Sequence, residues 1–317
     1  LGRVLGQTCD EVHVDVREVG GAHLLHRAAD VRARFNRHGI ARHDAAHGHG
    51  ARVAPGRDAA HHDVAVGEHP GERAVVLAHG QCADAAHAFG ARRGEKRVGN
   101  IADFSSFSFH AVKNFTTAEG GALTWRSIRG IDNDEIYHRL QLLSLHGQSK
   151  SALEKTKLGA WEYDVVGTWY KCNMTDIAAA IGLAQFERYP AMQQRRKQLI
   201  AKYDAALRPQ GIKTLNHYAK EHESSGHLYM TRVPTITSEQ RNEIILKMSE
   251  QGVACNVHYK PLPMHTAYKK LGFDIANYPN AYALFENEIT LPLYSILSDE
   301  NAEYVIEKYT AILKEYI

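Results

Sequence analysis

The composition of the chain changes abruptly near residue 82, and this break limits what each part can fold into. Residues 1–82 contain no Lys, Ser, Tyr, Trp or Met, yet they hold eleven of the twenty His residues. Their apolar residues are mostly Val, Leu and Ala, interrupted by His, Arg and Asp, and Phe35 is their only aromatic residue. Such a segment builds little hydrophobic core. We therefore expect an ordinary globular fold only from residue 83 onward.

The residues in excess in this segment have codons that begin with G or C, which is a property of DNA and not of folding. Out-of-frame translation of a gene rich in G and C at third codon positions gives this bias. Shifted back by one base, residues 43–47 permit Ile-Thr-Pro-Arg-Thr. We favour a coding error over a genuine low-complexity domain or a metal-binding His-rich arm. Because neither an HExxH pair nor a Cys/His ligand set is present, we predict no metal site.

Charge and cysteine content exclude several classes of partner. Thirty-eight basic and thirty-six acidic residues leave a formal charge of +2, which does not indicate binding to nucleic acid or to an anionic membrane. The four cysteines lie far apart without a C-x-x-C pair, which favours a reducing compartment. No apolar run is long enough to span a bilayer. We expect a cytoplasmic protein that acts on small molecules.

From Ala83 onward the pattern is that of an α/β protein. Strands are predicted at 104–110 and at 121–125, with Lys113 in the loop between them. Helices are predicted at 175–189 and, starting anew at Pro190, through about residue 207. Beyond residue 212 we expect strands at 228–233 and 253–259, helices at 238–251, near 267, near 282 and at 298–316, and an extended piece at 289–291.

These elements suggest a domain organisation. We predict a large domain at 83–190 that is incomplete, a connector helix at 191–211 and a small α/β domain at 212–317. The charged run at 195–197 is expected to form a solvated helix face. Because residues 1–82 supply few strands, we also expect the strand at 104–110 to lose ladder partners and the chain to fold poorly.

A lysine, an acid and a hydroxyl lie at suggestive positions around the first predicted strand. Asp84 follows a short apolar lead-in, Ser108 lies near the end of the strand, and Lys113 follows on a loop. The run 116–121 (TTAEGG) adds hydroxyl groups and a glycine turn that lets backbone pass close to a ligand. Pyridoxal phosphate needs these groups: an amine for its aldehyde, an acid for its pyridine nitrogen and donors for its phosphate.

The segment 108–122 (SFHAVKNFTTAEGGA) resembles the signature of the sugar aminotransferase family of the DegT/DnrJ/StrS type. The segments 84–90 (DAAHAFG) and 170–182 (YKCNMTDIAAAIG) resemble two further family motifs. The resemblance extends from about residue 83 to the C-terminus and includes 257–259 and 291–294.

This resemblance implies a pyridoxal-phosphate enzyme of fold type I, with a mixed sheet in a partial large domain and a smaller C-terminal α/β domain. It also implies a homodimer with shared active sites. The expected reaction transfers an amino group, usually from glutamate, to a nucleotide-linked keto-sugar in polysaccharide or glycan biosynthesis. The alternative is a non-catalytic remnant or a miscalled gene product of the same family.

The resemblance also assigns roles to single residues. Lys113 would form the Schiff base and shuttle protons, Asp84 would pair with the pyridinium, and His87 would pack near the oxygen side of the ring. Ser108 would bind the cofactor phosphate. A related dehydratase branch has histidine in place of the lysine, so Lys113 argues against that branch.

Two further assignments concern the surroundings of the cofactor. Asn173 would reach the phosphate of the cofactor in the other subunit, and His258 would line the sugar entrance. Family members also carry a phosphate-binding helix N-terminus and an aromatic residue that stacks on the ring, ahead of the Asp84 motif. Neither is recognisable in residues 1–82.

Overall fold

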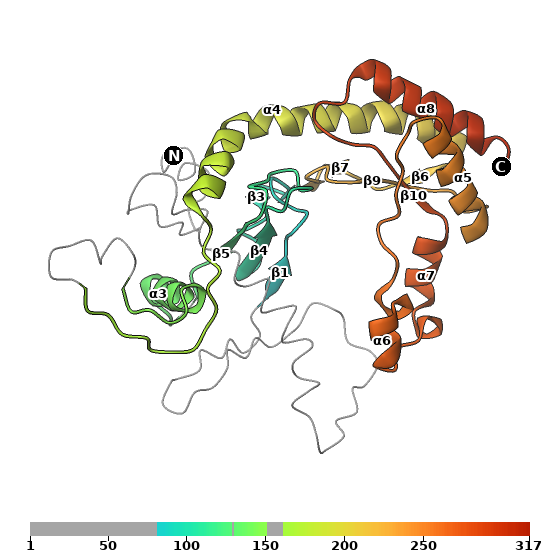
Figure 1. Cartoon of the computed structure of the whole chain (residues 1–317). Helices are drawn as coiled ribbons and strands as arrows, with labels where there is room; N and C mark the ends of the chain where they lie inside the picture. The colour runs from blue at the N-terminus through green and yellow to red at the C-terminus, as the bar shows by residue number, and fades with distance from the viewer. Residues whose placement is uncertain (1–80, 129, 151–160) are drawn as a thin grey trace. The chain divides into compact units, whose positions relative to one another are not determined.

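The computed structural model describes residues 81–128, 130–150 and 161–317 (Figure 1). The interpretations of residues 1–80, including the coding error and the His-rich arm, lie outside the described residues. The chain divides into two compact units, Leu1–Arg188 and Tyr189–Ile317.

The first unit contains a sheet in which β4 (Phe104–Ser108) is the central strand (Figure 1). β1 (Cys82–Asp84) pairs with it in parallel, and β5 (Gly121–Trp125) pairs with it antiparallel. β4 therefore has a hydrogen-bonded neighbour on each side. The expectation that this strand loses its ladder partners is wrong, because residues 81–84 and 121–125 supply both of them.

The strand β4 ends at Ser108, earlier than the predicted end at residue 110. The N–H of Phe109 donates to the carbonyl of Gly120 (2.8 Å), and the N–H of Thr117 donates to the carbonyl of Phe109 (2.9 Å). These bonds belong to the turn that leads into β5. Ala118 takes a positive φ of 65° within this turn, which is unusual for a residue other than glycine. The chain thus reverses just after Ser108.

An aromatic cluster forms the core behind this sheet. Phe89 lies with its ring centroid 5.6 Å from that of Phe107, 5.5 Å from that of Phe109 and 4.7 Å from that of Phe115. Side chains alternate across a strand, so Phe107 points to the same face as Phe109, and Ser108 points to the opposite face. Phe107 and Phe109 therefore lie on one face of the sheet, and the opposite face carries Ser106 and Ser108 together with the buried apolar residues Leu123 and Trp125.

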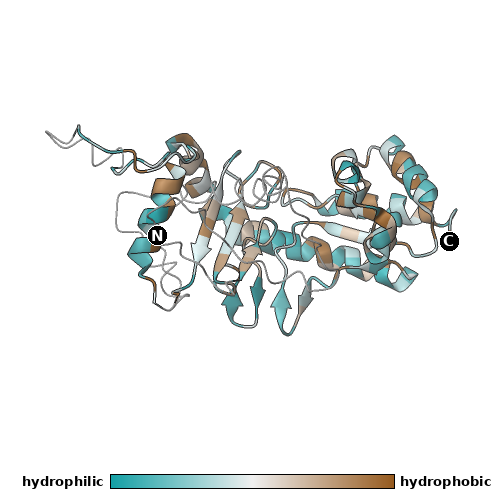
Figure 2. Cartoon of the chain, turned by 90° about the horizontal axis from the view of Figure 1, so that it is seen from below, coloured by the Kyte–Doolittle hydropathy of each residue, from teal (hydrophilic) through white to brown (hydrophobic). Residues whose placement is uncertain are grey.

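The other described elements of the first unit are short. β2 (Arg92–Arg93) and β3 (Lys96–Arg97) form a hydrophilic hairpin (Figure 2). α3 (Asn133–Ser144) was not among the predicted helices; Asp132 caps it by accepting a hydrogen bond from the N–H of Asp134. Its buried residues are few, so the apolar periodicity that marks a helix in a sequence is weak here.

α4 (Asp176–Leu207) is one continuous helix with Pro190 inside it. The prediction that a new helix begins at Pro190 is wrong. Proline removes one backbone hydrogen bond, but its ring is exposed and the adjacent turn is held by Gln193, whose side chain donates to the hydroxyl of Tyr189 at 2.5 Å. In the part of the chain that the structure describes, no helix is long and apolar enough to cross a membrane.

The second unit is built on an antiparallel sheet in the order β10 (Glu288–Leu291), β9 (Tyr229–Arg232), β6 (Lys213–Thr214). The helices α5 (Ser238–Glu250) and α8 (Asp299–Leu313) complete its core with part of α4. The largest wholly buried side chains in this core are those of Tyr203, Tyr229 and Tyr309.

Shorter elements complete this unit. They are η2 (Arg208–Gln210), the hairpin β7 (Tyr218–Ala219) and β8 (His222–Glu223), η3 (Leu262–Met264), α6 (Thr266–Lys270), η4 (Ile275–Asn277) and α7 (Pro279–Glu286). The predicted helices at 238–251, near 267 and near 282 are confirmed. The terminal helix is confirmed with a shorter extent than the predicted 298–316, since Ser298 is its N-cap and it ends at Leu313.

The segment 253–259 does not form the predicted strand. Asn256 makes a single bridge with Thr290. Two residues later the backbone N–H of His258 donates to the side-chain carboxylate of Glu288 at 2.8 Å. A side chain thus takes the place of the next ladder partner, and no sequence pattern shows this in advance.

Candidate active site

One face of the first sheet carries three polar side chains from β1 and β4. Asp84 is paired in register with Ser106, and Ser108 with Gly121. Residues paired in register point to the same face, and alternation along β4 places Ser106 and Ser108 on that face together. Gly121 contributes no side chain opposite Ser108. This face therefore presents an acid and two hydroxyl groups beside a position that carries no side chain. Leu123, which pairs with Ser106, is a buried apolar residue of the same face.

Asp84 is the last residue of β1 and is exposed. Its Oδ1 accepts a hydrogen bond from the N–H of Ala86 (3.0 Å), and the N–H of Ala85 donates to the carbonyl of Ser106 (2.9 Å). These bonds fix the carboxylate at the point where the strand turns away. Its charge can hold a proton on a ring nitrogen that lies over this face.

Lys113 lies on the loop that follows β4. Its N–H donates to the carbonyl of His110 (2.9 Å), and the imidazole of His110 lies 3.4 Å from the carboxylate of Glu119. The next two residues, Asn114 and Phe115, are buried. The ring of Phe115 belongs to the aromatic cluster, so the loop is anchored just beyond the lysine and the lysine side chain itself is half-buried.

The hydroxyl groups of the turn 116–121 were expected to serve a ligand, but in the structure they bond within the turn. The hydroxyl of Thr116 donates to the carbonyl of Phe109 (3.0 Å), and that of Thr117 donates to the carbonyl of Glu119 (2.9 Å). These hydroxyls therefore stabilise the turn. A Cβ atom on Gly120 would collide with the side chains of Thr117 and Met174, so glycine is required there for close packing.

Two predicted site residues of the first unit remain, His87 and Asn173. His87 is half-buried, in the turn that follows Asp84. Asn173 precedes α4; its Oδ1 accepts from Nζ of Lys171 (2.6 Å), and its amide nitrogen donates to the carbonyl of Met174 (3.4 Å). The structure thus brings Asp84, Ser108 and Lys113 to one sheet and its following loop, while Asn173 has local partners.

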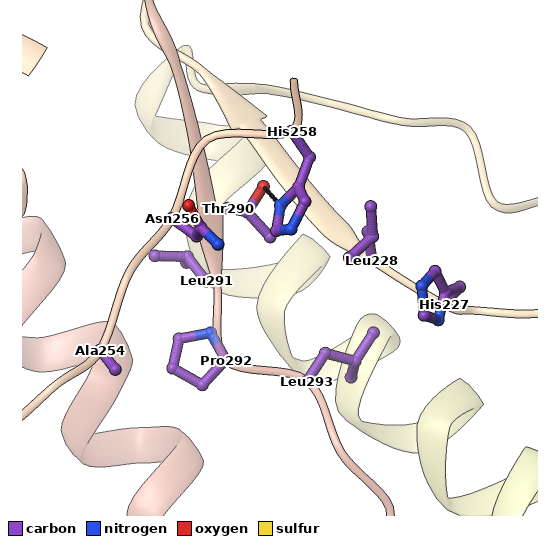
Figure 3. Close-up of a pocket in the computed structure, with 9 residues that line it drawn as sticks. All are labelled: His227, Leu228, Ala254, Asn256, His258, Thr290, Leu291, Pro292 and Leu293. Carbon is purple, nitrogen blue, oxygen red and sulfur yellow. Dashed lines mark hydrogen bonds between the residues drawn. The ribbon is translucent and has the colours of Figure 1, made fainter. Parts of the chain in front are cut away.

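His258 belongs to the second unit, where it lines a pocket of about 180 Å³. Its Nδ1 lies 2.8 Å from the hydroxyl of Thr290, and Figure 3 shows the imidazole beside that residue. Asn256, His227 and Leu293 also line the pocket. Among the described residues, no group of three or more His, Cys, Asp or Glu side chains could hold a metal ion.

Arg196 is a site residue that sequence reasoning missed. We expected the run 195–197 to be solvated, yet Arg196 is 8% exposed, so that expectation is wrong for this residue. Its Nη1 donates to the carbonyls of Gly226 (3.0 Å), His227 (3.4 Å) and Leu293 (3.0 Å), and so it joins two segments that border the pocket. Burial lowers the pKa of its guanidinium.

A signal for the burial of Arg196 was present in the sequence. It lies seven residues after Tyr189 and three or four residues before Leu199 and Ile200, and all three of these side chains are buried. Residues at this spacing share one face of a helix. The arginine therefore falls on the apolar stripe of α4.

The donor set on the first sheet fits pyridoxal phosphate. Lys113 offers an amine for the aldehyde, Asp84 an acid for the pyridine nitrogen and Ser108 a hydroxyl for the phosphate. Gly121 leaves the face beside Ser108 without a side chain that would compete for the space. The three groups thus have the chemistry that the cofactor needs, and two of them, Asp84 and Ser108, lie on one face of the sheet.

Comparison with known proteins identifies the family of the chain. The model of the DegT/DnrJ/EryC1/StrS aminotransferase family matches residues 81–310. The chain is 35% identical over 237 residues to the spore coat polysaccharide biosynthesis protein SpsC of Bacillus subtilis; the match covers 73% of the chain and 59% of SpsC. It is 30% identical over 238 residues to a UDP-4-amino-4,6-dideoxy-N-acetyl-beta-L-altrosamine transaminase of Campylobacter jejuni, a match that covers 73% of the chain and 58% of that protein.

Among solved structures, the chain resembles the putative sugar aminotransferase Spr1654 from Streptococcus pneumoniae in its PMP form. The TM-score is 0.72 at 54% identity, and the match covers 74% of this chain and 59% of that chain. Spr1654 also has a structure in its PLP form. The predicted fold type I is thereby confirmed. The chain spans about 59% of the length of the relatives it matches, and it belongs to the DegT/DnrJ/EryC1/StrS aminotransferase family.

Proposed function

We propose that this chain is part of a pyridoxal-phosphate-dependent aminotransferase that acts on sugars. The observation that carries the proposal is the placement of Asp84 and Ser108 on one face of the sheet, with Lys113 on the loop that follows. The chain covers about 59% of its relatives, so the activity of a whole protein is inferred from this part.

Each residue has a task that its position supports. Lys113 binds the cofactor and moves a proton between the substrate carbon and its own amine. Asp84 keeps the pyridine nitrogen protonated, because its negative charge stabilises the cation. The hydroxyl of Ser108 donates to the phosphate, and His87 packs beside the ring. When bound, the cofactor supplies the electron sink for the transfer.

We further propose a nucleotide-linked keto-sugar as the amino acceptor, glutamate as the donor, and polysaccharide or glycan biosynthesis in the cytoplasm as the setting. The names of two relatives support the substrate class: one acts in spore coat polysaccharide biosynthesis and the other is a transaminase of a UDP-linked amino sugar. His258 is placed at the sugar entrance in this proposal, since it lines a pocket with polar partners.

A homodimer with shared sites is the proposed assembly. Several apolar side chains between residues 161 and 177 are exposed in the single chain, among them Trp161 (78%), Val165 (53%) and Ile177 (78%), which is typical of a surface that a partner covers. We propose that Asn173 contacts the cofactor phosphate of the partner subunit. Mixed dimers of Asn173→Ala and Lys113→Ala subunits should recover activity at one of their two sites. Inactive mixed dimers of verified composition would count against sharing.

The central test is where the cofactor attaches. The protein incubated with pyridoxal phosphate should turn yellow, and borohydride should fix the cofactor on the peptide that contains Lys113. Lys113→Ala should lose the colour and lower turnover by about 10²–10⁴-fold or more, because both attachment and proton transfer are lost. Lys96→Ala, in the exposed hairpin of the same unit, is the matched control and should behave as the parent. Cofactor trapped on another lysine would refute the assignment.

A comparison of residues 1–317 with a protein whose upstream reading frame is restored tests the alternative of a remnant. The protein with the restored frame should have a higher cofactor content and a faster glutamate-dependent amination. If neither protein turns over nucleotide keto-sugars although both bind the cofactor at Lys113, the non-catalytic alternative is supported. Equal performance of both proteins would instead show that residues 1–82 act as a genuine domain.

A further inference from the structure

A chain of buried hydrogen bonds leads to His258 from inside the second unit. Glu288 is 2% exposed and Thr290 is 6% exposed, both on β10. The hydroxyl of Thr290 donates to Oε1 of Glu288 at 2.5 Å and lies 2.8 Å from Nδ1 of His258. The second carboxylate oxygen, Oε2, accepts from the backbone N–H of His258 at 2.8 Å.

The direction of each bond follows from the protons that are available. A hydroxyl has a single proton, and that of Thr290 is used on the carboxylate of Glu288. Thr290 therefore acts as acceptor toward His258, and Nδ1 of the imidazole must carry the proton. In the neutral ring this leaves the lone pair on Nε2.

We propose that Glu288 is a positioning residue which, through Thr290, holds His258 in the Nδ1–H tautomer so that Nε2 accepts a hydrogen bond from a substrate. The ring lines the pocket together with Asn256 and Leu293, which is where a ligand would meet it (Figure 3). The ligand chemistry is a hydrogen-bond donor, either a sugar hydroxyl or the ammonium group of the amino donor.

The surroundings of Glu288 support a carboxylate with a function beyond packing. Burial raises the pKa of the Glu288 carboxyl group, and the hydrogen bonds from Thr290 and His258 with the charge of Arg241 oppose that rise. Arg241 is itself buried and donates to the carbonyl of Phe285 at 2.6 Å. A buried acid is costly, and an apolar residue at this position of β10 would avoid the cost.

Replacing Glu288 by Gln tests the direction of the chain with almost no change of shape. The amide oxygen of Gln must accept from the backbone N–H of His258, so its NH₂ group faces Thr290 and donates to it. The hydroxyl of Thr290 then turns to donate to Nδ1 of His258. Glu288→Gln should therefore move the proton of His258 from Nδ1 to Nε2.

The full chain labelled with [¹⁵N]histidine reports the tautomer by long-range ¹H–¹⁵N correlation at pH 8.5, above the usual pKa of histidine of about 6.5. The spectrum of His258→Gln identifies the signal. We expect Nδ1–H in the parent and Nε2–H in Glu288→Gln. An Nε2–H parent, or a tautomer that Glu288→Gln leaves unchanged, would overturn the inference.

Two threonine variants separate the relay from general stability. Thr290→Val removes the relay, so His258 should lose its single tautomer. Thr231→Val is the matched control: this buried threonine on β9 bonds to the carbonyl of Ile289 and to Tyr309, and its loss should leave the tautomer of His258 as in the parent. If Glu288→Gln does not fold, the Thr290→Val protein still tests the relay. A spectrum in which its His258 remains entirely in the Nδ1–H tautomer would refute the relay.

The ligand part of this inference rests on the proposed function, and half-reactions separate the two donors. If the ligand is the amino donor, Glu288→Gln should raise KM about tenfold or more for glutamate alone. If it is the sugar, KM should rise in the return half-reaction with a UDP-linked 4-keto sugar. Unchanged KM in both would refute the ligand role. Failure of the proposed function would appear separately, as no borohydride trapping at Lys113 in the parent.

Discussion

The proposed cofactor residues of the first unit and the closed core of the second unit divide chemistry and stability between them. In the first unit, Asp84 is exposed at the end of β1, Lys113 is half-buried on the loop after β4, and Ser108 is buried in β4. The second unit encloses Tyr203 and Tyr309 in a closed core. A charged side chain that binds a ligand must remain accessible, so it adds little to a packed core. Substitutions of Asp84 and Lys113 should therefore affect chemistry, and substitutions in the hydrophobic core of the second unit should affect folding.

The largest expected effect lies in the first unit. Asp84→Asn keeps the size of the side chain and its acceptor for the N–H of Ala86, but removes the charge. Turnover should fall by about 10²–10³-fold, the usual loss when one preorganised electrostatic group is removed. The midpoint of urea unfolding should stay within experimental error. A large drop in that midpoint with normal turnover would contradict the division.

A core substitution in the second unit should instead lower the stability of the fold. Ile244 is fully buried, and Ile244→Ala should lower the free energy of unfolding by about 2–5 kcal/mol. Hydrogen exchange should show lost protection in β9 and β10, with β4 and β5 protected as before. The surface substitution Leu246→Ala, on the same helix and 65% exposed, is the control. Equal loss of protection in both units would mean that they unfold together.

A smaller effect is expected at the start of α5. Thr237 caps this helix: its hydroxyl accepts from the N–H of Gln240, whose side chain accepts from the N–H of Thr237. Thr237→Ala should cost about 1 kcal/mol in the free energy of unfolding. Thr235→Ala, at an exposed position just before the helix, should cost much less. Similar losses in both variants would show that the cap contributes nothing.

The smallest effect concerns the surface charge at the start of α8. Hydrogen bonds from Lys202 and Arg195 lower the pKa of Asp299. A lowered pKa in the folded state gives stability that is present above the usual pKa and lost as the pH falls through the folded value. The difference in Tm between the parent and Asp299→Asn should therefore shrink from pH 7 to pH 3, and also in high salt. A difference that grows toward pH 3 would contradict the sign.

Local patterns were sufficient for much of the fold. The alternation around Phe107 predicted β4, and the polar segment between hydrophobic runs placed Lys113 on the following loop. The capping residues Thr237 and Ser298 lie where the helices were predicted to begin. Such signals act over a few residues, which is why a sequence can show them.

The tertiary structure decided what depends on residues far apart in the chain. Pro190 stays inside a helix because neighbouring side chains support that turn, and 253–259 lacks a ladder because Glu288 takes its N–H. Burial of Arg196 likewise depends on carbonyls about 30 and 97 residues away.

For the candidate site, the amine, the acid and the hydroxyl could be predicted from the sequence, because Asp84 belongs to the short segment 84–90 and Ser108 and Lys113 to the short segment 108–122, and each segment can be interpreted without tertiary contacts. That Asp84 and Ser108 share a sheet face follows from strand register and needed the tertiary structure. The contact of Glu288 with His258 through Thr290 also needed the tertiary structure. A buried hydrogen bond requires both partners within about 3 Å, and a separation of 30 positions along the chain leaves no trace of that distance in the sequence.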